Sequence, residues 1–395
     1  MAVTGPDHTR ELHAQGHLVD MGERMTYKMR LWIGVGILCL AAVGVAAYLH
    51  SPRFGRPFSP QRLARVEASS HYINGHFENL KPVPVISGPD KGLIRGLMDY
   101  FMEERPDVVP EEPVPSAKVN LWKQDRNEDF VVWMGHSSFY MQLDGKRILV
   151  DPVFSDYASP IFFANRAFKG SNVYTADDIP PVDILVISHD HWDHLDYPTI
   201  MSLKDKIGKI VCPLGVGEYF EEWGFRPSQL YEEDWDSDVE IAPDFHIHVL
   251  TAQHFSGRLL ERNPTEWASY AFITPTHKVD YSGDSGYGPH FRDIGDTFGG
   301  FDLALLENGQ YDPQWHNIHM LPEETAQAAT DLQARYVIPV HNSKFALARH
   351  AWQAPMQSLE KAHRGASWNL LTPEIGEKVS MQKPGRFPEW WVNRK

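Results

Sequence analysis

A six-residue segment at the end of an apolar run constrains this chain more than any other part of its sequence. The run DILVIS at 183–188 predicts a buried strand, and HDHWDH follows it at 189–194. His189 and His191 stand two positions apart, so in extended backbone their side chains point to the same side. Asp193 and His194 follow as the chain turns back. Zn²⁺ and similar ions accept imidazole and carboxylate ligands, so we predict a metal site here; the alternative is a solvated histidine cluster without function.

Three further candidate ligands also follow strand-like runs. His254 follows FHIHVLTAQ, Asp284 follows KVDYSG, and His341 follows YVIPV. For each of them taken alone, a hydrogen-bonded loop residue is an equally good interpretation. His246 and His248 alternate within one predicted strand, and we interpret them as structural.

Past the first third of the chain, the sequence becomes rich in short strand-like runs. FVVWM at 130–134 and DLALL at 302–306 are examples, and Gly, Pro or Asp bound most of these runs. Helix-like stretches such as PEETAQAATDLQA at 322–334 lie between the later ones. We therefore expect an α/β domain over residues 119–395, with sheets packed together and helices outside. The proline-rich residues 50–118 are predicted to be a connector that packs on this domain.

An uncharged run of 19 residues, LWIGVGILCLAAVGVAAYL at 31–49, follows an N-terminal tail at 1–30. A helix of this length can cross the hydrocarbon core of a bilayer, which is about 30 Å thick. We expect a single-pass membrane anchor, placed in the inner membrane if the chain is bacterial. A signal sequence cleaved near Val45, Ala46 and Ala47, with an exported product, is the alternative. Basic residues flank both ends of the run, so the side of the membrane that the domain faces stays open.

The net charge of the chain limits which partners it can bind. The chain has 37 Lys and Arg against 52 Asp and Glu, a formal charge of −15. A surface this acidic repels a phosphate backbone, so we expect no nucleic acid partner. The two cysteines, Cys39 and Cys212, are too few for a disulfide framework or an all-cysteine zinc site.

Taken together, these motifs resemble the metallo-β-lactamase superfamily. Its marks are an Asp after an early strand, H-x-H-x-D-H, and then a His, an Asp and a His that each close a strand; the first Asp here is Asp151 in VDPVF. Within the superfamily the chain is most similar to the branch of N-acylphosphatidylethanolamine-hydrolysing phospholipase D and its bacterial relatives. The segments that carry this similarity are WMGHSSFYMQL at 133–143, DPVFSDYASP at 151–160, ISHDHWDHLD at 187–196, PLGV at 213–216, AQHFSGR at 252–258, GDSGYG at 283–288 and HMLPEE at 319–324.

The resemblance implies an αββα sandwich, two mixed sheets with outer helices, that holds two zinc ions and activates a bridging hydroxide. The implied ligands are His189, His191 and His254 for the first ion and Asp193, His194 and His341 for the second, with Asp284 bridging the two. Asp193 and Asp284 would thereby take part in catalysis. Asp151 would orient ligands from behind, and His319 would contact the substrate or its leaving group, although a loop-stabilising role explains His319 equally well.

Two substrate classes fit such a site, and so does a protein without activity. A phosphodiester of an N-acyl phospholipid is favoured by the anchor, and the aromatic segment PIFF at 160–163 could add a lipid contact, although core packing explains it equally well. A lactone or other small ester is the alternative. A non-catalytic binding module is the third possibility, and the complete ligand set argues against it. The family's W-G-T after the last ligand is replaced here by Asn342, Ser343 and Lys344, which bears on the substrate.

Overall fold

The computed structural model describes residues 8–85, 102, 107–258 and 261–394, with side chains from residue 29 onward. By contacts between residues, the chain divides into two compact units, Met1–Gly55 and Arg56–Lys395. The second unit therefore begins well before residue 119.

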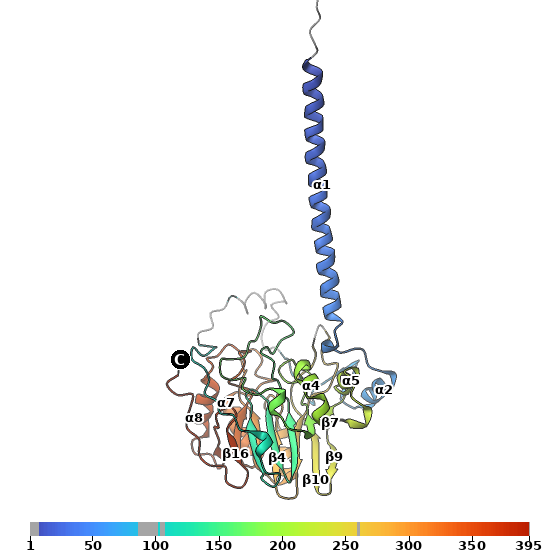
Figure 1. Ribbon diagram of the computed structural model, residues 1–395. Helices are drawn as coiled ribbons and strands as arrows, with labels where there is room; N and C mark the ends of the chain where they lie inside the picture. Colours follow the sequence, from blue (N-terminus) through green and yellow to red (C-terminus); the bar gives the residue numbers. More distant parts are fainter. Residues whose placement is uncertain (1–7, 86–101, 103–106, 259–260, 395) are drawn as a thin grey trace, which may run out of the picture. The chain divides into compact units, whose positions relative to one another are not determined.

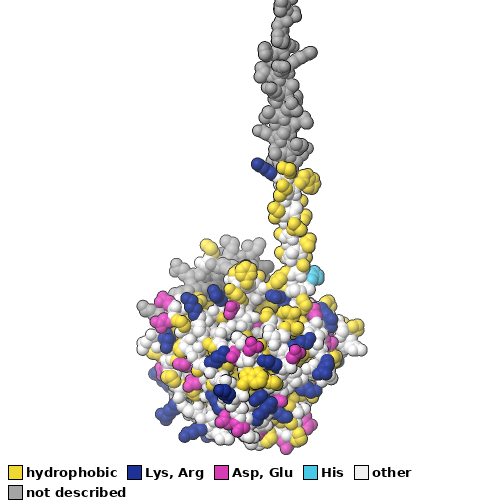
Figure 2. All heavy atoms as spheres, in the orientation of Figure 1, with side chains coloured by type: hydrophobic (Ala, Val, Ile, Leu, Met, Phe, Trp, Pro, Cys, Tyr) yellow, Lys and Arg dark blue, Asp and Glu magenta, His cyan; other side chains and the backbone are white. Residues whose placement is uncertain are grey.

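One long helix, α1 (His8–Leu49), makes up most of the first unit. Its part from Met29 to Leu49 has a mean hydropathy of 2.2, and none of it is buried. Figure 2 shows hydrophobic side chains around this part of the helix. By length and composition the helix can span a membrane, and a signal sequence would have the same properties.

The second unit is built on two seven-stranded mixed sheets (Figure 1). In the first sheet the order is β16 (Lys378–Ser380), β3 (Phe130–Trp133), β4 (Phe139–Leu143), β5 (Lys146–Val150), β6 (Val182–Val186), β7 (Ile207–Pro213) and β8 (Leu230–Glu233). In the second sheet the order is β15 (Asn369–Leu370), β14 (Ala334–Val340), β13 (Phe301–Glu307), β12 (Lys278–Tyr281), β11 (Ser269–Ile273), β10 (Phe245–Leu250) and β9 (Ser237–Ala242). Strands β5 to β8 are parallel to one another, as are β12 to β15, and the other neighbours are antiparallel.

Alternation of side chains along the strands sorts the core into layers. One face of each sheet contributes to a shared cluster that includes Val131, Met141, Ile247 and Phe272. The other face of the first sheet packs against α4 (Tyr197–Leu203) and α5 (Gly217–Glu222). The other face of the second sheet packs against α6 (His290–Phe298), α7 (Pro322–Asp331) and α8 (Ala354–His363). The order of layers is helix, sheet, sheet, helix, as the αββα prediction requires.

Helix α7 ends earlier than the sequence pattern indicates. It starts as expected, with Pro322 in the first turn and the Leu321 amide donating to Glu324 at 2.9 Å. The pattern at 322–334 suggested three more helical residues. Gln333 instead takes the left-handed φ of 54°, and Ala334 is already the first residue of β14.

The described part of residues 56–85 packs on the first sheet and its helices. In α2 (Pro60–Ala68), the buried guanidinium of Arg62 pairs with Glu218 at 2.6 Å and with Glu232 at 2.9 Å. Because a buried charge is costly without partners, this contact fixes α2 on the domain. A short hairpin follows, β1 (Tyr72–Ile73) with β2 (His76–Phe77), and leads the chain to Asn79.

The carboxyl ends of the parallel strands point to one end of the sandwich. Asp151 follows β5 and His189 lies beyond β6, while Asp284 and His341 follow β12 and β14. At two of these ends the backbone is left-handed, with φ of 40° at Asp151 and 65° at His341. Residues with a Cβ rarely adopt this conformation, and it turns each side chain sharply out of its strand.

Candidate metal centre

All seven predicted ligands converge at the carboxyl ends of the strands, where they form two groups together with one further residue, His136. The first group consists of His189, His191, His254 and Asp284, and the second of His136, Asp193, His194 and His341. Within each group, one candidate ligand atom per residue lies within 4.8 Å of all the others. Asp284 also forms a third set with His319 and His341. The function of these residues as metal ligands remains our prediction.

In the first group, three imidazole nitrogens face a common point. His191 Nδ1 lies 2.8 Å from His189 Nε2 and 3.2 Å from His254 Nε2. In a tetrahedral zinc site with bonds of about 2.0–2.1 Å, ligand atoms are roughly 3.3 Å apart. The spacing of these nitrogens therefore fits a small divalent cation.

In the second group, the ligand atoms surround Asp193. Its Oδ2 lies 2.7 Å from His136 Nε2 and 3.5 Å from His194 Nε2. The other nitrogen of His194, Nδ1, lies 2.8 Å from Asp151 Oδ2. The carboxylate of Asp151 thus holds the ring so that Nε2 faces the centre of the group.

Asp284 lies where a ligand shared by both groups must lie. Its Oδ2 is 3.1 Å from His194 Nε2 in the second group, and 3.7 and 3.8 Å from His189 Nε2 and His254 Nε2 in the first. The other oxygen, Oδ1, is 3.1 Å from His341 Nδ1. One carboxylate therefore reaches both groups.

Several buried atoms at the centre lack a hydrogen-bond partner of suitable geometry among the described residues. These are His194 Nε2, His341 Nε2 and Asp284 Oδ1. Leaving a buried polar atom unsatisfied costs about 1–3 kcal/mol, and all three are the atom types that bind cations. The donor set therefore fits bound metal.

The protonation states of three imidazoles favour this role. Burial lowers the pKa of His189, His254 and His341 well below the ordinary value for histidine. These rings are neutral at physiological pH, which is the form that binds a metal ion.

His194 and Asp193 form a charged pair instead. Burial alone would lower the pKa of His194, but the carboxylates of Asp284 and Asp193 raise it well above the usual value. Burial alone would raise the pKa of Asp193, but His194 and His136 hold it well below. Without a cation, a proton on His194 balances the carboxylates.

Asp151 occupies the position that the resemblance implies for it, behind the ligands. It is fully buried, and its two oxygens accept hydrogen bonds from the Ser188 amide and hydroxyl and from Tyr281 Oη at 2.6 Å. Ser188 Oγ in turn lies 2.9 Å from His189 Nδ1. Asp151 therefore supports both groups, His194 by direct contact and His189 through Ser188.

His136 and its neighbour Ser137 also lie at the centre, although neither was predicted from the sequence. His136 follows β3 with a left-handed φ of 54°, and its backbone carbonyl accepts from the His341 amide at 2.9 Å. Ser137 Oγ lies 2.9 Å from His341 Nδ1. His136 closes a strand, as the predicted ligands do, and it lies in the segment WMGHSSFYMQL, so the same pattern could have identified it.

His319 faces the centre without belonging to either group. Its ring stacks on that of His341, with centroids 5.2 Å apart, and its Nδ1 makes a short contact with Glu307 Oε1. Burial would lower the pKa of His319, but Glu307 raises it above the ordinary value. Glu307 also accepts from the Ser285 amide at 2.7 Å, next to Asp284.

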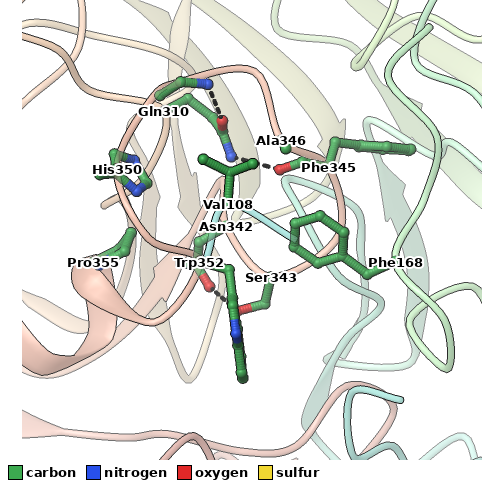
Figure 3. Close-up of a pocket in the computed structure, with 11 residues that line it drawn as sticks. Val108, Phe168, Gln310, Asn342, Ser343, Phe345, Ala346, His350, Trp352 and Pro355 are labelled. Carbon is green, nitrogen blue, oxygen red and sulfur yellow. Dashed lines mark hydrogen bonds between the residues drawn. The ribbon is translucent and has the colours of Figure 1, made fainter. Parts of the chain in front are cut away.

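The turn that carries His341 is supported from behind by polar side chains around a small cavity (Figure 3). Gln310 Nε2 donates to the Phe345 carbonyl at 2.9 Å, and Gln310 Oε1 accepts from the Ala348 amide at 2.9 Å. Lys344, where the family has W-G-T, is fully buried and donates to the Val153 carbonyl at 2.7 Å. Burial lowers the pKa of Lys344 to about 7. These residues fix the backbone of the turn.

Comparison with known proteins identifies the family. A model described as the beta-lactamase superfamily domain matches residues 146–342. An uncharacterized protein of Mycobacterium tuberculosis is 36% identical over 329 residues, which are 82% of this chain and 88% of that protein. The mitochondrial N-acyl-phosphatidylethanolamine-hydrolyzing phospholipase D of Saccharomyces cerevisiae is 32% identical over 286 residues, 68% of this chain and 59% of that enzyme.

A solved structure supports the fold. An isothiocyanate hydrolase from Delia radicum gut bacteria aligns over 64% of this chain and 98% of its own, with a TM-score of 0.50 and 17% identity. The chain therefore belongs to the metallo-β-lactamase superfamily, and the αββα sandwich predicted from the sequence is confirmed. Within that superfamily it is a metallo-hydrolase with relatives among the N-acylphosphatidylethanolamine-hydrolysing phospholipases D.

Proposed function

We propose that this protein is a binuclear zinc hydrolase that cleaves a phosphodiester of an N-acyl phospholipid in the manner of a phospholipase D. The observation that carries the proposal is the pair of ligand groups joined by Asp284, in a chain that is 32% identical to the yeast phospholipase. The seven ligands are assigned to two zinc ions as the resemblance implies.

The residues of the two groups would hold the ions, and the residues behind them would keep the ligand side chains in position. The first ion would bind His189, His191 and His254, and the second would bind Asp193, His194 and His341, with Asp284 shared. Bound divalent cations supply a coordinated water of lowered pKa and stabilise the negative charge that develops on the phosphoryl oxygens. Asp151 and Ser188 orient the rings, so that little reorganisation is needed when substrate binds.

His319 is placed to act on the substrate. It is about one-tenth exposed, whereas His254 and His341 beside it are enclosed. Glu307 favours its protonated form, which can donate a proton to the oxygen of the departing alcohol. Phosphodiester cleavage leaves an alkoxide, so a proton donor at this position would assist the reaction.

A lipid substrate agrees with the N-terminal helix. A membrane-spanning helix would hold the protein at the surface where its substrate resides. We propose a single-pass membrane protein, with an exported form after signal cleavage as the alternative. The acidic surface supports the absence of a nucleic acid partner.

The test uses the full chain purified in detergent. We expect two zinc ions per chain by elemental analysis, and hydrolysis of N-acylphosphatidylethanolamine at the bond that releases the N-acylethanolamine. His191→Ala should abolish turnover and lower the zinc content. His246→Ala is the matched control, because His246 is a partly exposed histidine that contacts Asp238. Turnover of a lactone without phosphodiester turnover would replace the proposal with an ester hydrolase, and zinc binding without either activity would indicate a binding module.

A further inference from the structure

A short loop presents two aromatic rings to solvent. Phe162 and Phe163 are 77% and 72% exposed, and Ile161 before them is 39% exposed. The two rings contact each other edge to face, with centroids 5.3 Å apart. Exposure of large apolar side chains to water is unfavourable. A cluster of them at one tip therefore indicates a surface that binds an apolar partner.

The base of this loop is a closed hairpin. Tyr157 and Arg166 form an isolated antiparallel bridge, and the Ala158 amide donates to the Asn165 carbonyl at 3.0 Å. The Ala167 amide donates to the Asp156 carbonyl at 2.8 Å. These bonds hold the aromatic tip away from the body of the domain.

The hairpin stands at the rim of the candidate metal centre. Ala158 belongs to a small buried cluster with Val153 and Phe345. The ring of Phe345 lies 5.2 Å from that of His136, which contacts the ligand Asp193. The base of the hairpin is therefore connected to the second ligand group through the buried ring of Phe345.

Two exposed cationic side chains follow the aromatic tip in the sequence, at and just beyond the base of the hairpin. Arg166 is exposed and lies over the ring of Tyr157, with its guanidinium carbon 5.9 Å from the ring centroid. Lys169 is exposed three positions further on. Aromatic rings with basic side chains behind them match a lipid interface, where rings enter the acyl boundary and cations meet phosphates.

We infer that the hairpin at 156–167 is a lipid-docking element whose aromatic tip enters the surface of a bilayer that carries anionic phosphates. The candidate membrane span Met29–Leu49 lies in the same chain. If it is inserted in a bilayer, the covalent link raises the effective concentration of lipid around the hairpin. The inference deepens the proposed function, because a docked hairpin would lead the phosphodiester of a membrane lipid to the rim of the metal centre. The docking itself needs no catalysis.

The experiment places a fluorescent label at the tip of the full-length protein. Cys39 is exposed and Cys212 is buried, so Phe162→Cys in a Cys39→Ser background gives one reactive thiol at the site of interest. Glu240→Cys in the same background is the control, on the exposed side of the edge strand β9. A circular dichroism spectrum and a thermal midpoint equal to those of the parent verify the fold of each variant. The proteins are reconstituted into phosphatidylethanolamine–phosphatidylglycerol vesicles, and quenching by aqueous iodide and by brominated lipid is compared.

We expect brominated lipid to quench the label at position 162 several-fold more than the label at 240, and iodide to show the reverse order. Replacing Arg166 and Lys169 by Glu should reduce the lipid quenching at 162. Equal quenching at the two positions would overturn the inference. Shielding from iodide that appears in detergent and grows with protein concentration would also overturn it, in favour of a second copy of the chain. Because quenching needs no turnover, failure of docking and failure of the phosphodiesterase proposal are distinguished.

Discussion

The two ligand groups of the candidate metal centre are supported in different ways. In the first group, neutral atoms orient the rings: Ser188 Oγ lies 2.9 Å from His189 Nδ1, and the Ile318 carbonyl lies 3.0 Å from His254 Nδ1. In the second group, charged side chains do so, with Asp151 beside His194.

This difference indicates how each group behaves without metal. In the second group, the Asp193 carboxylate, together with Asp284 and Asp151, balances a protonated His194, so these residues attract one another even when no ion is bound. The first group contains three neutral imidazole nitrogens that face one another, with one carboxylate oxygen at 3.7 Å or more. We therefore predict that the geometry of the first group depends more on a bound cation than that of the second group.

The largest effect should come from Asp284→Ala, which removes the one side chain shared by both groups. We expect zinc content to fall at both positions, and phosphodiester turnover to fall by about 1,000-fold or more, because the loss of metal assistance is worth several kcal/mol. Elemental analysis and steady-state kinetics check both effects. Loss of one ion with the other retained at full affinity would show that Asp284 serves a single group.

The next effect should come from Asp151→Asn, which tests the charged support of the second group. We expect the affinity for the second ion to fall about 10–100-fold, as for other changes behind metal ligands. Titration of zinc against a competing chelator gives the two affinities separately. Asp129→Asn is the matched control, since Asp129 also faces a histidine, His277, at 3.2 Å. An equal loss in both variants would point to general destabilisation.

Asn79→Ala tests the first group from a distant part of the chain. The Asn79 side chain accepts from the His254 amide at 3.0 Å and donates to the His254 carbonyl at 2.8 Å. Without these bonds we expect the first ion to bind about tenfold more weakly, with little change at the second. In Asn369→Ala, which removes a side-chain bond to the Arg335 carbonyl, both affinities should stay at the parent value. An unchanged first affinity in Asn79→Ala would contradict the comparison of the two groups.

The smallest effect should come from Ser137→Ala. It removes one neutral hydrogen bond to His341 Nδ1, worth about 0.5–1.5 kcal/mol, while Asp151 and His136 still support the second group. We expect the second affinity to change by about tenfold at most, measured by the same chelator titration. A loss as large as that in Asp151→Asn would mean that the hydroxyl orients this group as strongly as the carboxylate does.

The sequence predicted which candidate ligands lie together, because each of them follows a strand and the carboxyl ends of parallel strands meet. That pattern is local and can be seen at His189, Asp284 and His341 without a structure. The supports could not be identified in this way. Asn79 contacts His254 across 175 positions and His136 contacts Asp193 across 57, and only the folded chain brings these pairs together. The predicted end of α7 was wrong for a related reason. The sequence pattern favours a helix up to Ala334, but Ala334 pairs with Phe301 of β13 and therefore belongs to β14.

The left-handed backbone at His136, Asp151 and His341 links the activity of this protein to its folding stability. Such a conformation costs an ordinary residue about 1–2 kcal/mol, and glycine adopts it freely. Glycine at one of these positions would relieve that cost, but it would also leave the buried partners of the lost side chain unsatisfied, at about 1–3 kcal/mol for each group. The Asp151 carboxylate alone has Ser188, Tyr281 and His194 as partners. The strained backbone at these turns is therefore stabilised by the same side chains that the turns direct into the centre.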